Sequence, residues 1–196
     1  MLAKRQKQTK RRARQGIVGA NRATFDLWHR PVEPARGVSP QSGFALCDRL
    51  TLYHDAQKPR VLWRQKQVGG ALDFRLTIYQ FDGEYLSLAA GLPIEDCAAI
   101  VPGNRVEVVF EGGASRPLNC FLRLNLTADE HHEVLHEAFV FHQGRYHIEF
   151  DPSGLPLAFG NRLSVWLDII FSQPAMCEIN IASLDIAVHE LRERAP

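Results

Sequence analysis

Apolar and polar residues alternate strictly along the C-terminal part of the chain. Val165, Leu167 and Ile169 share one side of the segment, and the alternation resumes over 184–188 after a break that contains Pro174. A period of two is the repeat of a β-strand that buries one face. Proline lacks the backbone donor that a sheet ladder needs, so we interpret the break as a crossing between two strands.

The same period recurs upstream. The clearest further strands are predicted at 72–79, 104–111, 118–127 and 145–150, with shorter ones at 50–55 and 60–64. Asp82 and Gly83 form a dipeptide typical of a tight turn, so the strand at 72–79 and a further strand at 85–90 are predicted to form a hairpin. Glycine-bearing segments at 112–117 and 142–144 predict two more reversals. The pattern gives about eight to ten strands and, at 92–101, one short helix.

These elements predict an all-β fold. We favour a two-sheet antiparallel β-sandwich of jelly-roll type, and an open barrel is the alternative. The sandwich domain is assigned to residues 44–192. A segment rich in proline and glycine, 24–43, is predicted to be an extended linker that wraps the domain. Residues 1–23 form a basic arm without an apolar stripe, which we expect to be flexible on its own.

The net charge of +1 hides a strong asymmetry along the 196 residues. Eight of the 23 basic residues precede the first acidic residue, Asp26, which leaves 15 basic and 22 acidic residues and a charge of −7 on the remainder. Clustered cations bind nucleic acid or anionic membranes without sequence specificity. The predicted polyanion-binding residues are Lys4, Arg5, Lys7, Lys10, Arg11, Arg12 and Arg14. A solubilising tail is the alternative, and a cytoplasmic adaptor that docks through the arm is the second function we consider.

Several classes of protein are disfavoured by the sequence. It has no apolar run of 18 residues and no signal-peptide pattern, so we expect a soluble cytoplasmic protein without a transmembrane segment. The four cysteines are far apart and form no C-x-x-C pair, so they are expected to be small core residues. No nucleophile motif or phosphate-binding loop is found, and we expect neither catalysis nor a cofactor.

The histidines of the segment 128–137 suggest a metal site, because His132 and His136 would face the same way on a strand and imidazole binds zinc. The same residues are equally typical of a polar turn that enters an edge strand. We therefore predict no metal site.

Polar faces of three predicted strands combine aromatic rings with hydrogen-bonding groups. Aromatic rings stack on sugar rings, and arginine, asparagine and aspartate form directional hydrogen bonds with hydroxyls. We predict that this surface binds a glycan or a protein partner. The predicted ligand-binding residues are Arg75, Tyr79, Arg123, Asn125, Trp166 and Asp168. Two alternatives are a solvated face with an Arg75–Asp168 pair, and a core position for Trp166 and Phe121 in the other layer.

Four blocks, at 50–55, 74–93, 122–126 and 165–186, together resemble an uncharacterised bacterial family known as a domain of unknown function. Its members carry blocks of the type L-F-H-D, F-D-G-x-[FY]-L-S-L, A-R-L-N and W-[VL]-D-L-I-F. The resemblance covers roughly residues 44–188. It implies a β-sandwich and no assigned activity, catalytic residue or ligand. More loosely, the last strand is similar to that of carbohydrate-binding modules, in which it reads I-x-[IL]-x-D-[IV] after a turn with proline or glycine.

Overall fold

The computed structural model describes residues 39–47, 49–68, 71–92, 97, 100, 104–128, 131–155 and 163–190. Its strands are β1 (Phe44–Cys47), β2 (Leu50–His54), β3 (Arg60–Val68), β4 (Ala71–Gln80), β5 (Tyr85–Gly91), β6 (Asn104–Ala128), β7 (His131–Phe150), β8 (Leu163–Ser172) and β9 (Cys177–Glu190). A 3-10 turn, Pro152–Gly154, follows β7. The helix predicted at 92–101 lies mostly outside the described residues. Within the described ranges, no helix has the length and apolar character needed to cross a membrane.

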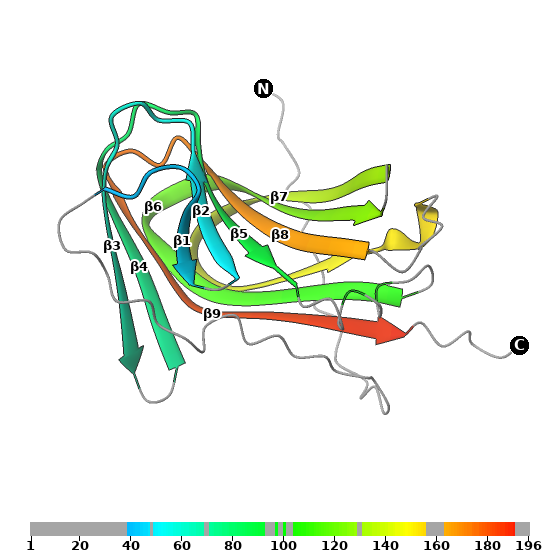
Figure 1. The fold of residues 1–196 in the computed structure, drawn as a ribbon. Coiled ribbons are helices and arrows are strands. Elements are labelled where there is room, and N and C mark those ends of the chain that lie inside the picture. The colour runs from blue at the N-terminus through cyan, green and yellow to red at the C-terminus, as the bar shows by residue number, and fades with distance from the viewer. Residues whose placement is uncertain are drawn as a thin grey trace, which may run out of the picture.

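The strands form one antiparallel sheet that folds over on itself (Figure 1). The order is β1-β2-β5-β8-β6-β9-β4-β3, and β7 pairs with β6. The long strand β6 belongs to two layers, because residues 104–114 pair with β9 and residues 120–128 pair with β8. The first layer therefore contains β1, β2, β5, β8 and the second half of β6, and the second layer contains the first half of β6 with β9, β4 and β3. This confirms the predicted sandwich of jelly-roll type, with the qualification that its two layers are parts of one folded sheet.

The reversals predicted at 112–117 and 142–144 are wrong. The chain continues through both segments as bends of β6 and β7, and the pairing register of these strands shifts between Gly113 and Leu118. Gly112 is required by a close approach, since a Cβ atom there would lie 2.3 Å from the backbone oxygen of Asn180 on β9. Glycine therefore permits the passage of a neighbouring strand here and does not form a turn.

The hairpin predicted at the Asp-Gly dipeptide is also wrong, because β4 and β5 lie far apart in the strand order and their connection passes from one layer to the other. The connection is held against the one between β2 and β3. Asp82 accepts a hydrogen bond from the backbone N–H of Gln57 at 3.0 Å. The carboxylate of Asp55 accepts hydrogen bonds from the N–H groups of Glu84 and Tyr85, both at 3.1 Å. The β2–β3 connection and the β4–β5 connection, which both pass between the layers, are thus held next to each other.

The crossing predicted at Pro174 is confirmed, because this residue lies in the connection between β8 and β9. β8 runs along the second half of β6 and β9 along the first half, so the connection passes the bend. Arg116 donates hydrogen bonds to the carbonyls of Gln173 at 3.0 Å and Ala175 at 2.9 Å. These hydrogen bonds therefore attach the bend of β6 to the connection between β8 and β9.

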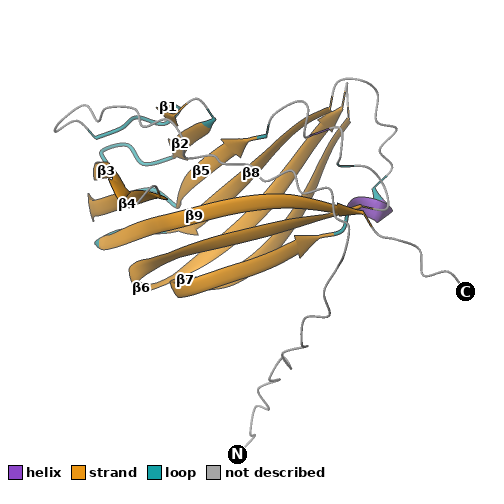
Figure 2. Cartoon of the chain, turned by 90° about the horizontal axis from the view of Figure 1, so that it is seen from below, coloured by secondary structure: helices purple, strands orange, loops and turns teal. Residues whose placement is uncertain are grey.

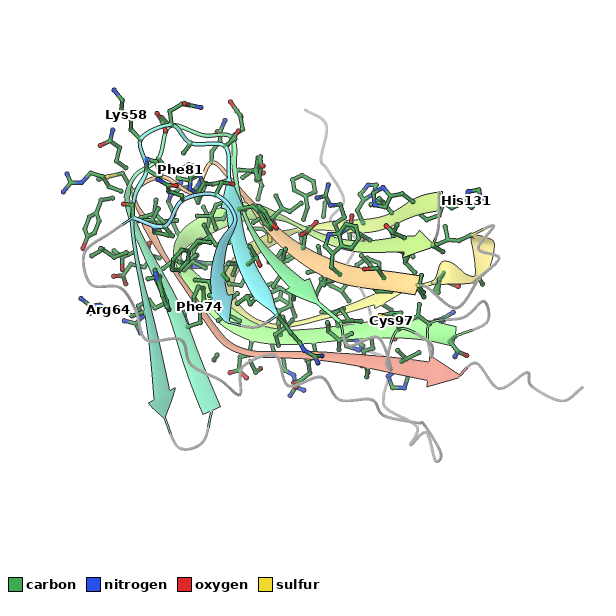
Figure 3. The ribbon with its side chains drawn as sticks, viewed as in Figure 1. Lys58, Arg64, Phe74, Phe81, Cys97 and His131 are labelled. Carbon is green, nitrogen blue, oxygen red and sulfur yellow. The ribbon has the colours of Figure 1, made fainter. Side chains whose placement is uncertain are left out.

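The inward faces follow the predicted alternation. Figure 3 labels Phe74 on β4, which is buried, and Arg64 on β3, which is exposed. The buried apolar residues of the two layers form one core cluster. Aromatic rings gather at the bend, where Phe110 lies 5.7 Å from Phe139 and 4.8 Å from Tyr146 between ring centroids. This packing fills the space where the two layers join.

Three of the cysteines are buried thiols, as the sequence predicts. Cys97, Cys120 and Cys177 all belong to the core cluster. Burial raises the pKa of Cys177 to about 11, although the charge of Arg116 acts in the opposite direction. The side chain of Cys47 lies outside the described residues. The three described thiols therefore act as small apolar core residues.

The basic arm and most of the linker, residues 1–38, lie outside the described residues. The end of the linker packs on the sandwich. Ser39 accepts a hydrogen bond from the N–H of Val61 at 3.1 Å, and Ser42 accepts one from the N–H of His54 at 2.9 Å. The imidazole of His54 also lies 3.1 Å from the carbonyl oxygen of the buried Pro40. These contacts attach the end of the linker to β2 and β3.

The outer face of the second layer carries a carboxylate between two imidazoles. Glu107 on β6 forms hydrogen bonds with His147 on β7 and, at 2.6 Å, with His189 on β9. Burial acts to raise the pKa of Glu107, but the hydrogen bonds and charges of His189 and His147 lower it below its ordinary value of 4.5. The folded chain therefore binds this proton more weakly than the unfolded chain.

This cluster predicts a pH-dependent contribution to stability. Because the folded-state pKa is lowered, the contribution is present above the ordinary pKa and is lost as the pH falls through the folded-state value. We expect Glu107→Gln to lower the melting temperature at pH 7 and the difference from wild type to shrink below about pH 4.5. Thermal unfolding between pH 7 and pH 3 measures this difference. The exposed Glu111 on the same strand supplies the control Glu111→Gln. A difference that grows as the pH falls would contradict the assignment.

Candidate functional site

A groove lies on the outer face of the first layer. It has a volume of about 920 Å³ and extends over β2, β5, β8 and the second half of β6. Figure 2 shows β2, β5 and β8 side by side, as their pairing requires. The lining residues are Arg49, Thr51, Tyr53, Tyr85, Ser87, Ala89, Gly91, Phe121, Arg123, Trp166, Asp168, Ile170 and Ser172. A groove of this volume is large enough for a small-molecule ligand or a short polymer segment.

The groove runs along β5, whose outward residues after Tyr85 are small. Ser87, Ala89 and Gly91 form its floor, while their inward neighbours fill the core. Gly91 pairs with Trp166 on β8. A Cβ atom on Gly91 would meet nothing closer than the backbone oxygen of Arg49 at 4.0 Å. Neither neighbouring atoms nor a positive φ requires glycine here, so its effect is to leave the floor open beside the indole.

Trp166 forms one wall of this hollow. The imidazole of His132, on β7, stacks on the indole with 5.7 Å between ring centroids and an interplanar angle of 7°. In the strand order, β5 with Gly91 lies on one side of β8, and β6 and β7 lie on the other side. The imidazole of His132 therefore covers the indole face on the β7 side, and the other indole face lines the groove. Tyr53 and Phe121 also line the groove with partly exposed rings. These rings offer flat apolar surfaces for stacking.

Asp168 carries a polar network on the groove floor. Its Oδ2 atom accepts hydrogen bonds from Nε and Nη2 of Arg123 at 2.9 and 2.7 Å, and from Nδ2 of Asn125 at 3.0 Å. Asp168 is 4% exposed and Asn125 is 1% exposed, while the side chain of Arg123 is 44% exposed. Three donors on one carboxylate oxygen hold Asp168 and Arg123 in fixed orientations.

The network leaves hydrogen-bonding capacity unused. Among the described residues, Oδ1 of Asp168 and Nη1 of Arg123 have no hydrogen-bond partner. The hydroxyl of Ser87 is buried and also has no partner in the described part of the chain. A buried polar atom without a partner costs about 1 to 3 kcal/mol. A ligand with hydroxyl groups would supply the missing partners.

Four of the six predicted ligand-binding residues come together in this region: Arg123, Trp166 and Asp168 line the groove, and Asn125 lies beneath them. Arg75 and Tyr79 do not, because β4 belongs to the second layer. Tyr79 is 52% exposed and borders a separate depression of about 230 Å³.

The structure also decides between the alternatives for this face. The partner of Asp168 is Arg123, which pairs across β6 and β8, and the Arg75–Asp168 pair is wrong. Trp166 and Phe121 both line the groove, so the core position considered for them is wrong as well. The aromatic and polar residues of this face therefore belong to one accessible site.

The β2 and β5 side of the groove is not among the residues that the sequence predicts for the site. Tyr53, Tyr85, Ser87 and Gly91 belong to short strands whose partners the alternation does not specify, and Arg49 directly precedes β2. The decreasing size of the outward residues along β5 is the one local signal in the sequence. It becomes informative only once β5 is known to lie between β2 and β8.

The histidines considered for a metal site lie on β7. His132 and His136 are exposed, and His132 stacks on Trp166. Within the described ranges, no group of three or more histidine, cysteine, aspartate or glutamate residues could hold a metal ion. His132 instead packs against Trp166 and supports the wall of the groove.

The fold and the groove define the chain as a jelly-roll β-sandwich with one hollowed sheet face. The chain belongs to the family of unknown function DUF6478, whose model matches residues 4–195. This match confirms the resemblance to an uncharacterised family with no assigned activity. Comparison with curated protein sequences gave no match.

Three solved structures illustrate what the fold is similar to. A family 11 carbohydrate-binding module of a cellulosomal cellulase of Clostridium thermocellum has 9% identity and a TM-score of 0.47, over 79% of this chain and 95% of that one. A xylan-binding domain from Paenibacillus barcinonensis has 12% identity and a TM-score of 0.43, over 78% and 99% of the two chains. The enzymatically active domain of a tailspike protein of bacteriophage CBA120 has 9% identity and a TM-score of 0.48, over 72% of this chain and 19% of that one. Similarity at this level does not establish a shared function.

Proposed function

We propose that the protein is a non-catalytic glycan-binding protein whose groove holds a segment of a sugar chain. The observation that carries the proposal is the indole face of Trp166, which borders the open floor at Gly91 beside unused polar atoms. The apolar face of a sugar ring stacks on an aromatic ring, and its hydroxyls both donate and accept hydrogen bonds. Asp168 Oδ1, Arg123 Nη1 and the Ser87 hydroxyl supply both kinds of partner.

A peptide segment is less well suited to this groove. Extended peptides commonly bind by adding a strand to the exposed edge of a sheet. β5 and β8, which form the groove floor, are both paired along their two edges. A peptide would therefore have to bind without backbone pairing. The mixture of aromatic faces and short polar groups favours a sugar chain.

The groove offers little for hydrolysis of a bound sugar. Glycoside hydrolysis commonly uses two carboxyl groups on opposite sides of the scissile bond. Asp168 is the one carboxylate among the described residues that line the groove, and Arg123 and Asn125 already engage its Oδ2 atom. This supports binding without catalysis.

The contact of the basic arm with polyanions stays a prediction, as does a cytoplasmic location. Lysine and arginine substitutions in the arm, with binding measured against salt concentration, test the first prediction. Cell fractionation tests the second.

Trp166→Ala tests the groove directly. We expect a glycan array probed with the full-length chain to identify a ligand, and the variant to bind that ligand about tenfold more weakly because a stacking surface is lost. The melting temperature should change little, because the indole is half-buried and lies outside the core cluster.

The control is Trp166→Phe, which retains an aromatic face and should retain most of the affinity. Calorimetric titration and thermal unfolding of each variant separate binding from folding. Absence of binding to every glycan would overturn the proposal. Unfolding of Trp166→Ala would instead show that the indole is a structural residue.

A further inference from the structure

We infer that the groove recognises an acidic glycan, with Arg49 as the residue that binds a uronate carboxylate. The inference rests on the proposed function and specifies the chemical class of its ligand. It is carried by the charges that line the groove, by the position of Arg49 opposite Trp166, and by the open floor between them.

The groove has the opposite charge balance from the rest of the domain. Its formally charged lining residues are two arginines, Arg49 and Arg123, and one carboxylate, Asp168. The chain after the basic arm carries 15 basic and 22 acidic residues. A positive site on an acidic body attracts an anionic ligand to that site specifically.

Arg49 provides the unmatched positive charge. Asp168 is already paired with Arg123 at 2.7 Å. The side chain of Arg49 is exposed and has no ion pair or hydrogen bond with any other described residue. Its guanidinium can therefore donate two parallel hydrogen bonds to a carboxylate, for which its planar geometry is well suited.

The backbone places Arg49 directly across the hollow from Trp166. The carbonyl oxygen of Arg49 accepts a hydrogen bond from the N–H of Gly91 at 2.8 Å. Gly91 in turn pairs with Trp166. Arg49 and Trp166 thus lie two strand spacings apart, about 10 Å between their backbones. A sugar ring above Gly91 would stack on the indole and direct an exocyclic carboxylate toward the guanidinium.

The experiment compares acidic glycans with uncharged forms of the same chains. The probes are oligosaccharides of polygalacturonate and of alginate, together with their methyl esters, which keep the backbone and remove the charge. We expect the full-length chain to bind at least one acidic form about tenfold more tightly than its ester at low salt, as a charge-assisted contact provides.

Arg49→Gln should remove most of this preference, because it weakens binding of the acid about tenfold more than binding of the ester. Arg64→Gln makes the same change in charge on β3, at the far end of the strand order from the groove, and should leave the preference intact (Figure 3). Equal effects of the two substitutions would overturn the inference, since they would indicate a general effect of net charge.

The basic arm requires its own control because it can also bind acidic chains. In a full-length variant, Lys4, Arg5, Lys7, Lys10, Arg11, Arg12 and Arg14 are all replaced by glutamine. The preference for the acidic form should persist in this variant. Its loss there would overturn the inference and assign the preference to the arm.

The remaining outcomes separate the inference from the proposed function. Equal affinity for acid and ester, with both lost in Trp166→Ala, would overturn the inference and retain the groove as a glycan site. Binding to neutral glycans alone would have the same meaning. Binding to no glycan of any kind would overturn the proposed function itself.

Discussion

Phe110→Ala is expected to lower the free energy of unfolding by about 3 to 5 kcal/mol, the range typical of a deleted core aromatic ring. Phe110 is fully buried on β6, next to the bend that joins the two layers. Its ring contacts the rings of Phe139, Phe141 and Tyr146, with centroid distances from 4.8 to 5.9 Å. β6 and β7 both bend here, and four aromatic rings pack together, so a cavity there cannot close by moving one side chain.

Denaturant unfolding of the full-length chain measures this loss. The matched control is Val109→Ala at the adjacent residue, which points outward and is half-buried. It should cost less than about 1 kcal/mol because little apolar area is removed from the core. A loss for Phe110→Ala no larger than for this control would show that the aromatic cluster does not hold the bend.

The bend also shows why the sequence predicted the core better than the connections. An inward position in a strand is specified by the residue itself, so the alternation correctly placed Leu122, Leu124 and Ile169 in the core. Glycine is used both for a turn and for a close approach of strands. Gly112 serves the second purpose because Asn180 passes it on β9, a neighbour that lies 68 positions away in the chain. Local sequence does not distinguish the two uses.

The candidate site was predictable to the extent that it depends on one strand pair. Asn125 and Trp166 are in register between β6 and β8, and so are Arg123 and Asp168. Their alternation and chemistry placed them on one face. Arg75 has the same alternation and similar chemistry, but period two does not specify which layer a strand joins. The separation of β4 from β8 is a property of topology, set by the crossings at Asp55 and Asp82.

The inward residues of β5 belong to the core, and its outward residues line the groove. Its inward residues Leu86, Leu88 and Ala90 are fully buried. Its outward residues after Tyr85 are small, and a Cβ atom at Gly91 would meet only the backbone oxygen of Arg49, at 4.0 Å. The core accounts for the inward set, but packing does not account for the small outward set. A substitution on the outward side can therefore remove the hollow and leave the core intact.

Gly91→Val makes this separation measurable. We expect the β-branched side chain to occupy the floor beside Trp166 and to weaken glycan binding about a hundredfold, since a ring can no longer approach both the indole and the floor. The same substitution should leave the stability unchanged or raise it by up to about 1 kcal/mol, because glycine is unfavourable inside a strand. Calorimetric titration with the ligand found on the array, and thermal unfolding, give the two values.

The control is Gly154→Val in the 3-10 turn after β7, where a Cβ atom would meet nothing within 4 Å and no groove residue is nearby in the chain. It should retain full affinity. If Gly91→Val binds as well as wild type, the ligand does not enter the hollow above β5, and the site must be sought elsewhere. If the Gly91→Val variant unfolds, the small outward residues of β5 are required for folding. Loss of binding at unchanged or higher stability is the one result that assigns the open floor of β5 to the ligand.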